Sequence, residues 1–344
     1  MKCCVRRSLF VFLGLIAAGA LLWHQDIWGW LSASPSPSAR ADDAESEPAA
    51  VKALAEALKD KDAEVRKNAA QSLGRIGKQA KSAVSALTES LKDSDVDVRG
   101  ASAVALGRIG KDAGSAASAL AELLKDKDHD VRGAAALALS RIGKDAKNTV
   151  PALKELAKDE DKQLQAYAHC ALAVLEDDPR PHIAALAENL SDKSVEVRGT
   201  AAYILGELGP LAKAAVPALT EALKDKAAAV RGMAAQALGE MGSAAKSAVA
   251  RLAALLKDED VDVRVSAAAA LGELGADARE AVPALIEALK DKDAEVRGTT
   301  INALGDIGSA AKAAIAAITR ALKDDDAEIR KAAALALGKI QEME

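Results

Sequence analysis

The stretch Asp225 to Gly242, DKAAAVRGMAAQALGEMG, decides the fold of this chain. Its aspartate, arginine, leucine and glycine return at intervals of 33 residues. The arginine slot is filled by Arg66, Arg99, Arg132, Arg198, Arg231, Arg264, Arg297 and Arg330, with Gln165 at the one remaining position. An aspartate stands six residues before each slot and a leucine seven residues after it. Nine units therefore run from residue 49 to residue 344 without an insertion, which indicates a repeat architecture.

Each unit reads as a pair of helices. Ala214 to Lys224 (AAVPALTEALK) places its apolar residues on one buried face, and Val230 to Met241 (VRGMAAQALGEM) supplies the second helix. Prolines such as Pro217 occupy a first-turn position, and glycines such as Gly242 stand where the second helix ends. Because alternation typical of strands is absent, the sequence predicts an all-α fold, an α-solenoid of nine 33-residue helix-pair repeats.

In Asp225 to Gly242 an aspartate is followed six residues later by an arginine and then by an Ala-Leu-Gly segment. This pattern resembles the HEAT repeat, particularly the short bilin-lyase-like subclass. The resemblance covers residues 49 to 344. It implies an array whose second helices line a concave face. It says little about function, because HEAT arrays serve as scaffolds, adaptors and enzyme accessories.

The fourth unit departs most from the pattern. Gln165 replaces the arginine, Ala173 and Glu176 replace glycines, and residues 177–181 (DDPRP) replace the usual helix connection. Because solenoid stability is nearly a sum of nearest-neighbour terms, we expect the weakest internal stacking at this unit.

The amino-acid composition restricts the class of partner that we expect. Half of the residues are hydrophobic and only 2% are aromatic, which suits closely stacked helices. The net charge of −5 provides no overall basic field, so sequence-independent binding of nucleic acid is not expected. The expected partner is a protein or a peptide.

The N-terminal residues 1–31 have the order of an export signal. Lys2, Arg6 and Arg7 precede an apolar run from Leu9 to Trp23. If the segment is a cleaved signal peptide, Ala18-Gly19-Ala20 offers the cleavage site. If it is an uncleaved anchor, Trp23, Trp28 and Trp30 form an interfacial belt, although 15 residues span only about 22 Å of helix. Both alternatives place the body outside the cytoplasm, either membrane-anchored or periplasmic or secreted.

A Ser/Pro-rich and then acidic stretch, residues 32–47, follows and reads as a disordered linker. The solenoid is expected from residue 48 to residue 344. The protein would thus touch a membrane only through its N-terminal segment, and only if that segment is uncleaved.

Catalytic and cofactor motifs are missing from the sequence. The four histidines show no paired metal-ligand spacing, and Cys170 beside His169 is interpreted as a packing residue. The recurring Asp and Arg are interpreted as a structural ladder of ion pairs within or between repeats. Paired helix glycines such as Gly232 and Gly239 are interpreted as points of close helix approach. We therefore expect a protein that is not an enzyme and that uses no cofactor or metal.

Candidate binding residues lie two, five and nine positions after the arginine slot, on the face of the second helix opposite the invariant leucine. We call these positions the inner stripe. It contains both tyrosines of the body, Tyr167 and Tyr203, and tyrosine is enriched at binding hot spots. The position nine residues after the slot reads Arg75, Arg108, Arg141, Val174, Glu207, Glu240, Glu273, Asp306 and Lys339.

The sign of the charge on the inner stripe changes near the tyrosines. Acids in the last turn of a helix oppose the macrodipole, so drift of a solvated face competes with a ligand-binding role. In the binding hypothesis an extended ligand places an acidic part on units 1 to 3 and a basic part on units 5 to 8. The alternative is a bilin-lyase-like chromophore-transfer factor, which only the repeat subclass suggests.

Overall fold

The computed structural model describes residues 46–342, and the predicted leader (1–31) and most of the predicted linker lie outside this range. Every regular element between residues 46 and 342 is a helix, which confirms the all-α prediction. The chain divides after His182 into two compact units. The first helix begins at Ser46, two residues before the predicted start of the solenoid.

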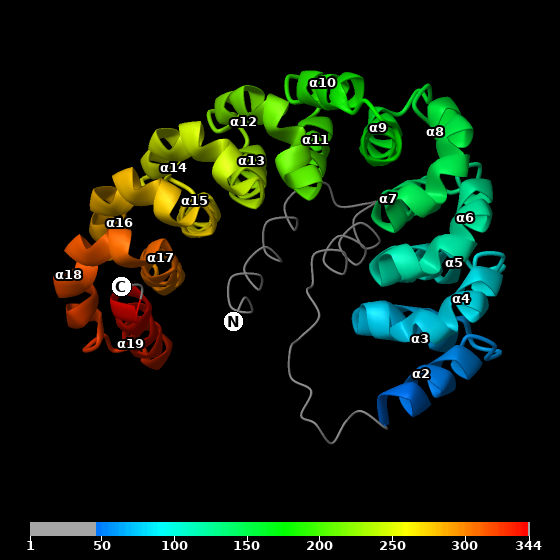
Figure 1. Cartoon of the computed structure of the whole chain (residues 1–344), viewed down its shortest axis with the longest axis horizontal. Coiled ribbons are helices and arrows are strands. Elements are labelled where there is room, and N and C mark those ends of the chain that lie inside the picture. The colour runs from blue at the N-terminus through cyan, green and yellow to red at the C-terminus, as the bar shows by residue number, and fades with distance from the viewer. Residues whose placement is uncertain (1–45, 343–344) are drawn as a thin grey trace. The chain divides into compact units, whose positions relative to one another are not determined.

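In both units the even-numbered helices are the first helices of the repeats and form the outer layer, while the odd-numbered helices form the inner layer (Figure 1). The first unit contains α2 (Ser46–Ala57), α3 (Ala63–Ile76), α4 (Val84–Ser90), α5 (Val96–Ile109), α6 (Ala117–Leu123), α7 (His129–Ile142), α8 (Val150–Leu156) and α9 (Lys162–Leu175). Helix α10 (Arg180–Asn189) begins at its C-terminal end.

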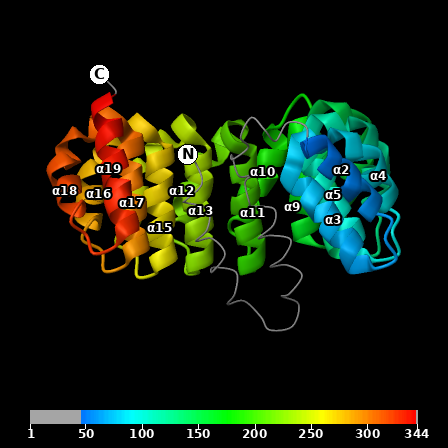
Figure 2. The ribbon, with the colours of Figure 1, turned by 90° about the horizontal axis from the view of Figure 1, so that it is seen from below.

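The second unit continues with α11 (Val195–Leu208), α12 (Val216–Ala222), α13 (Ala228–Glu240), α14 (Val249–Leu255), α15 (Val261–Glu273), α16 (Val282–Ala288), α17 (Ala294–Ile307), α18 (Ile315–Ala321) and α19 (Ala327–Glu342). Its inner helices run side by side (Figure 2). Neighbouring inner helices make the most extensive contacts in each unit, so the core is a continuous layer between repeats.

Most outer helices are shorter than the sequence predicts. A glycine after the inner helix adopts positive φ, as Gly77 does at 66° with ψ at −130°, a conformation that glycine adopts at low cost. Seven-residue 3-10 segments then lead into the outer helix, namely η4 (Gly77–Ala83), η5 (Gly110–Ala116), η6 (Gly143–Thr149), η7 (Gly209–Ala215), η8 (Gly242–Ala248), η9 (Gly275–Ala281) and η10 (Gly308–Ala314). The predicted helix from Ala214 therefore begins at Val216.

The fourth repeat ends differently because Glu176 takes the glycine position. Glu176 has an extended conformation with φ at −86° and ψ at 160°. No 3-10 segment separates α9 from α10, and α10 starts directly after the prolyl turn at Pro179. The fourth repeat is nevertheless a helix pair, α8 and α9, as the sequence predicts.

The recurring arginine joins consecutive repeats. The Nε and Nη2 atoms of Arg231 donate to the carboxylate of Asp258 in the next repeat, at 2.8 and 2.7 Å. Its Nη1 atom donates to the carbonyls of Asp225 and Lys226 in its own turn, at 3.0 and 3.2 Å. The Asp258 carboxylate also accepts the backbone N–H of Asp260. This confirms the ladder and assigns its ion pairs to neighbouring repeats.

Six such rungs form within the two units: Arg66–Asp93, Arg99–Asp126, Arg198–Asp225, Arg231–Asp258, Arg264–Asp291 and Arg297–Asp324. No rung joins Arg132 to Asp159 among the described residues, and the buried Nε atom of Arg132 has no hydrogen-bond partner there. Gln165 reaches only the carbonyl of Asp159. The ladder is thus interrupted where the sequence pattern departs.

A lowered pKa keeps five of the six rung carboxylates ionised, namely Asp93, Asp126, Asp225, Asp291 and Asp324. Burial raises the pKa of the Asp225 carboxyl, but hydrogen bonds from Arg198 and from the Ala227 amide outweigh burial and bring the pKa below its usual value. A carboxyl whose pKa is lowered on folding contributes stability above its unfolded pKa and loses it as the pH falls through the folded pKa. The rungs therefore persist at mildly acidic pH.

Glycines eight residues after the arginine slot allow the inner helices to approach closely. A Cβ atom added to Gly239 would lie 2.9 Å from Cα of Ala270 in the next repeat. The glycines one residue after the slot behave differently, because Gly133 and Gly199 face side chains rather than backbone and Gly298 has no neighbouring atom within 4 Å. The predicted close approach of a helix backbone is therefore correct for the later glycine and wrong for Gly199 and Gly298.

The stretch Ala294–Ala321 has the length and mean hydropathy of a membrane span, but half of it is buried in the fold. It comprises α17, η10 and α18, and Gly308 at φ 68° lies between the two α-helices. Its apolar residues therefore belong to the core of the second unit.

The ladder predicts unequal costs for two equivalent arginines. Replacing Arg231 by Met leaves the Asp258 carboxylate, 9% exposed, without its cation, and we expect a loss of about 2–4 kcal/mol of unfolding free energy. Arg330 is exposed and bonds only the carbonyls of Asp324 and Asp325, so Arg330→Met should cost less than about 1 kcal/mol. Urea denaturation followed by circular dichroism measures both, and equal losses would contradict the role of the rung.

The glycines allow a second matched comparison. Gly239→Ala should destabilise the protein by about 1–3 kcal/mol, because α13 and α15 must move apart. Gly298→Ala should stabilise it by about 0.5–1 kcal/mol, because alanine favours the helix and the added methyl meets no atom within 4 Å. Thermal unfolding curves of the two variants should therefore shift in opposite directions.

Candidate binding surface

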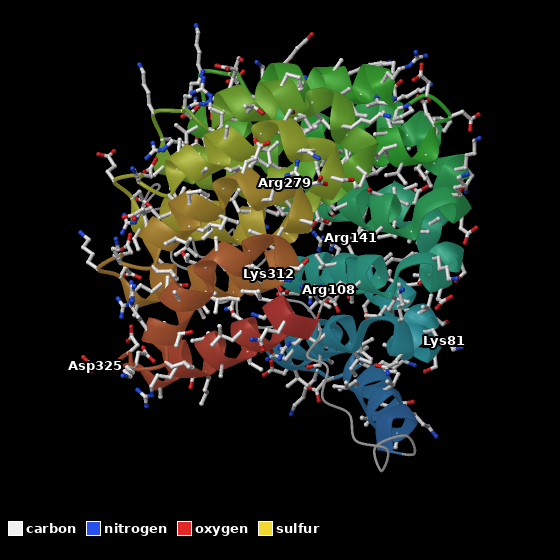
Figure 3. All side chains as sticks on the ribbon, turned by 60° about the vertical axis from the view of Figure 1, so that its left-hand side comes forward. Lys81, Arg108, Arg141, Arg279, Lys312 and Asp325 are labelled. Carbon is white, nitrogen blue, oxygen red and sulfur yellow. The ribbon has the colours of Figure 1, made fainter. Side chains whose placement is uncertain are left out.

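Helices α3, α5 and α7 carry the basic part of the inner stripe in the first unit. Arg75 lies in the last turn of α3 and is exposed, and Arg108 and Arg141 are half-buried in the last turns of α5 and α7. Figure 3 shows Arg108 and Arg141 close together on neighbouring helices, with Lys81 away from them. Stacking thus turns a sequence period of 33 residues into one column of cations.

The second unit carries the acidic part on α11, α13, α15 and α17. Glu207, Glu273 and Asp306 are exposed and Glu240 is half-buried. Each carboxylate after the first lies beside the glycine of the preceding repeat, as Glu273 does at Gly239. The missing side chain of that glycine leaves room for the acid.

Polar contacts within the second unit hold Glu240 and Asp306 of the acidic column. Gln236 donates to the Glu240 carboxylate at 2.9 Å, and Lys339 of α19 forms an ion pair with Asp306 at 2.6 Å. Lys339 thereby ends the column. Its Cδ atom lies over Gly305, so it occupies the place that the acids occupy in the repeats before it.

The two tyrosines of the stripe have different environments. Tyr167 in α9 is only 5% exposed, and its ring packs on Gly133 of α7, where a Cβ atom would be 3.0 Å from the ring. It therefore fills the space left by a glycine, and little of its ring is available to a ligand. Tyr203 in α11 is half-buried and remains a candidate contact.

No cluster of three or more His, Cys, Asp or Glu side chains able to hold a metal occurs among residues 46–342. Cys170 is 2% exposed, and its Sγ lies 3.5 Å from Oγ of Ser140 in α7. Its surroundings are those of a packing residue.

Sequence reasoning missed one side-chain cluster. The rings of His169 and His182 meet with their Nδ1 atoms 3.0 Å apart, although 13 residues separate them. Helix periodicity does not relate them, because the contact crosses the turn at Asp177–Pro181. The unusual sequence of that turn was the only available signal.

A protein-family model matches the repeats along most of the chain. The family model for HEAT repeats matches residues 39–107, 84–173, 183–272 and 248–338. The chain belongs to the HEAT-repeat family. Its fold is accordingly an all-α solenoid of helix-pair repeats, as the sequence resemblance implies.

Two solved structures are similar to this chain. One is the crystal structure of an engineered protein, 25% identical over 98% of both chains with a TM-score of 0.42. The other is the X-ray structure of YibA from Escherichia coli, 23% identical over 88% of this chain and 99% of that one, with a TM-score of 0.47. A search of curated proteins gave no match.

The interruption of the ladder predicts lower local stability at the fourth repeat. Besides lacking a rung, the contact between α7 and α9 lacks the glycine that lets inner helices approach closely, because Ser140 takes that position in α7. Loss of a charge-assisted hydrogen bond costs about 1.5–3 kcal/mol, so local opening should be at least about tenfold more frequent. We expect faster hydrogen exchange at pH 7.5 in residues 162–182 than in 96–109 or 228–273. Uniform protection across these segments would contradict the weak interface.

Proposed function

We propose that this protein is a non-enzymatic scaffold of the cell envelope that binds a protein or peptide along the inner stripe of its solenoid. The family supports a HEAT-repeat scaffold, and such repeats generally mediate protein–protein interaction. The observation that carries the finer proposal is the pair of charged columns, basic on the first unit and acidic on the second.

The acidic column costs some stability in each repeat that carries it. The carboxylates lie at the negative ends of their helices, which costs about 0.3–1 kcal/mol each. Like charges about 10 Å apart add roughly 0.4 kcal/mol per neighbouring pair before screening. The arginines of α3, α5 and α7 show that the same position accepts a cation without this cost. A partner with a basic segment gives the acids a reason to be there.

The partner in this proposal is an extended chain with charges of both signs. Its acidic part lies along Arg75, Arg108 and Arg141, and its basic part along the four acids of the second unit. Tyr203 supplies an aromatic contact, since tyrosine offers a large rigid surface at low entropic cost. The location in the envelope rests on the sequence of residues 1–31.

The test compares two triple variants with the same change in charge. Glu207, Glu240 and Glu273 are replaced by Lys in the first, and the exposed Glu221, Glu259 and Glu287, which are not part of the inner stripe, in the second. Both are used to capture partners from envelope extract, and association with the captured protein is then measured. Inner-stripe reversal should slow association and flatten its salt dependence, while the second variant should behave like the wild type.

Tyr203→Ala tests the aromatic contact separately. Because removal of a buried contact acts mainly on the complex once formed, it should speed dissociation more than it slows association. If both triple variants lose the partner equally, or if inner-stripe reversal leaves affinity unchanged at low salt, the inner stripe is not the binding surface. Capture of a tetrapyrrole with visible absorption in place of a protein would replace the scaffold by chromophore transfer.

A further inference from the structure

A chain of four titratable side chains closes the C-terminal end of the first unit. Lys154 of α8 forms an ion pair with Oε1 of Glu176 at 2.7 Å, and Oε2 of Glu176 lies 2.8 Å from Nε2 of His182. Nδ1 of His182 then meets Nδ1 of His169 at 3.0 Å. The His182 side chain is 11% exposed, and His169 is half-buried. The cluster therefore connects α8, α9 and the first turn of α10.

The hydrogen bonds of this cluster fix how many protons it can hold. The carboxylate of Glu176 only accepts, so Nε2 of His182 carries a proton. The two facing Nδ1 atoms share one further proton, because one of them donates and the other accepts. This condition is met when both rings are neutral, with His169 donating, and also when His182 is charged and donates to a neutral His169.

A second added proton breaks this arrangement. With both rings charged, two N–H groups would face each other 3.0 Å apart, and two cations would lie with ring centroids 5.3 Å apart. Glu176 can compensate only one of them, and its other oxygen is already bound to Lys154. The His169–His182 hydrogen bond is then lost, and the two rings repel each other, so that the ion pair of His182 with Glu176 is left to hold the start of α10 to α9.

Among the described residues of the first unit, His182 is the charged group that acts on His169. The remaining charged groups near the turn are paired with one another, Asp178 with Arg180 and Asp177 with Lys147. The hydrogen bond from Arg180 brings the pKa of Asp178 to about 2. On the α7 side, the residue next to His169 is Cys170, which meets the uncharged Ser140 hydroxyl.

We propose that His169, His182, Glu176 and Lys154 form an acid-sensitive latch, in which a second added proton breaks the contact of His182 with His169 and loosens the start of α10 from α9. The latch is a regulatory device that goes beyond the proposed binding function. It sits in the repeat whose ladder is interrupted, so no arginine rung holds α9 to α7 when it opens. The loosened stretch is the connection that leads into the second unit at Ile183.

The direction of the pH effect follows from His169. Burial lowers its pKa below the ordinary value, and the charge of His182 lowers it further. A group with a lowered folded pKa stabilises the folded form above its unfolded pKa, about 6.5 for histidine, and this stability is lost as the pH falls through the folded pKa. The latch is closed at neutral pH and opens in acid.

His129 provides a control of opposite sign in the same unit. A hydrogen bond to Asp130 raises its pKa despite burial, and the charge of Asp161 raises it further. Its Nε2 lies 3.0 Å from Oδ2 of Asp161, the residue that caps α9. Protonation of His129 therefore strengthens the contact between α7 and α9, and this contribution is lost as the pH rises through its folded pKa.

The test measures hydrogen exchange of the full chain at pH 7.5 and at pH 5.0, corrected for the intrinsic rates. One coupled proton changes an opening equilibrium by up to about tenfold per pH unit. We expect opening of residues 169–186 to increase toward pH 5.0 while residues 228–273 keep their protection. His169→Gln, which can still donate to His182 but does not titrate, should abolish the increase, and His129→Gln should retain it.

Histidine NMR of the wild type keeps the test decisive if His169→Gln fails to fold. His169 should titrate below the ordinary histidine range, because burial and the charge of His182 both lower its pKa. The proposal is overturned if the acid response persists in folded His169→Gln, if the wild type shows no acid response in residues 169–186, or if His169 titrates at or above the ordinary range.

Discussion

The bond between one arginine and the carboxylate of the next repeat is the interaction on which the solenoid depends. A single guanidinium binds two carbonyls of its own inter-helix turn and both oxygens of the following aspartate, as Arg231 does with Asp258. That aspartate also binds the turn that leads into its own inner helix. One side chain thus fixes the turn within a repeat and the register between repeats. Removing either partner would leave a largely buried charge, which explains why the two residues recur together.

Close packing of the inner helices is the second constraint, and it is coupled to the first. With glycine at position 239, α15 can approach α13 until backbone atoms touch. The repeat that lacks the arginine also lacks this glycine, having Ala173 in its place. The fourth repeat therefore uses other contacts. Tyr167 fills the space over Gly133, and His129 reaches Asp161. Where the other repeats have an arginine–aspartate ion pair, this repeat therefore has the packing of Tyr167 and the titratable contact of His129.

This difference makes the contacts of the fourth repeat depend on the charge of histidines, at His169 within it and at His129 of the repeat before it. Five of the six rung carboxylates have lowered pKa values, as at Asp225, and so remain charged in mild acid. His169 changes its charge in acid, because burial and the charge of His182 lower its pKa below the ordinary histidine value. In the proposed scaffold, acidification would act at this repeat while the ion pairs of the other repeats keep their charge. The charged inner stripe and the latch thus occupy different repeats and can be tested separately.

The sequence alone determined the repeat, its helix pairs and its ladder, because each depends on residues at a fixed spacing along one helix or across one turn. It also placed Arg108 and Glu240 on equivalent helix faces, since stacking repeats the geometry of each unit. It could not give the burial of Tyr167, the open space at Gly298 or the start of the outer helix at Val216, since these depend on neighbouring repeats and on the backbone at glycine. The pairing of His169 with His182 was decided only by the tertiary structure, because the irregular turn between them has no period from which a contact can be inferred.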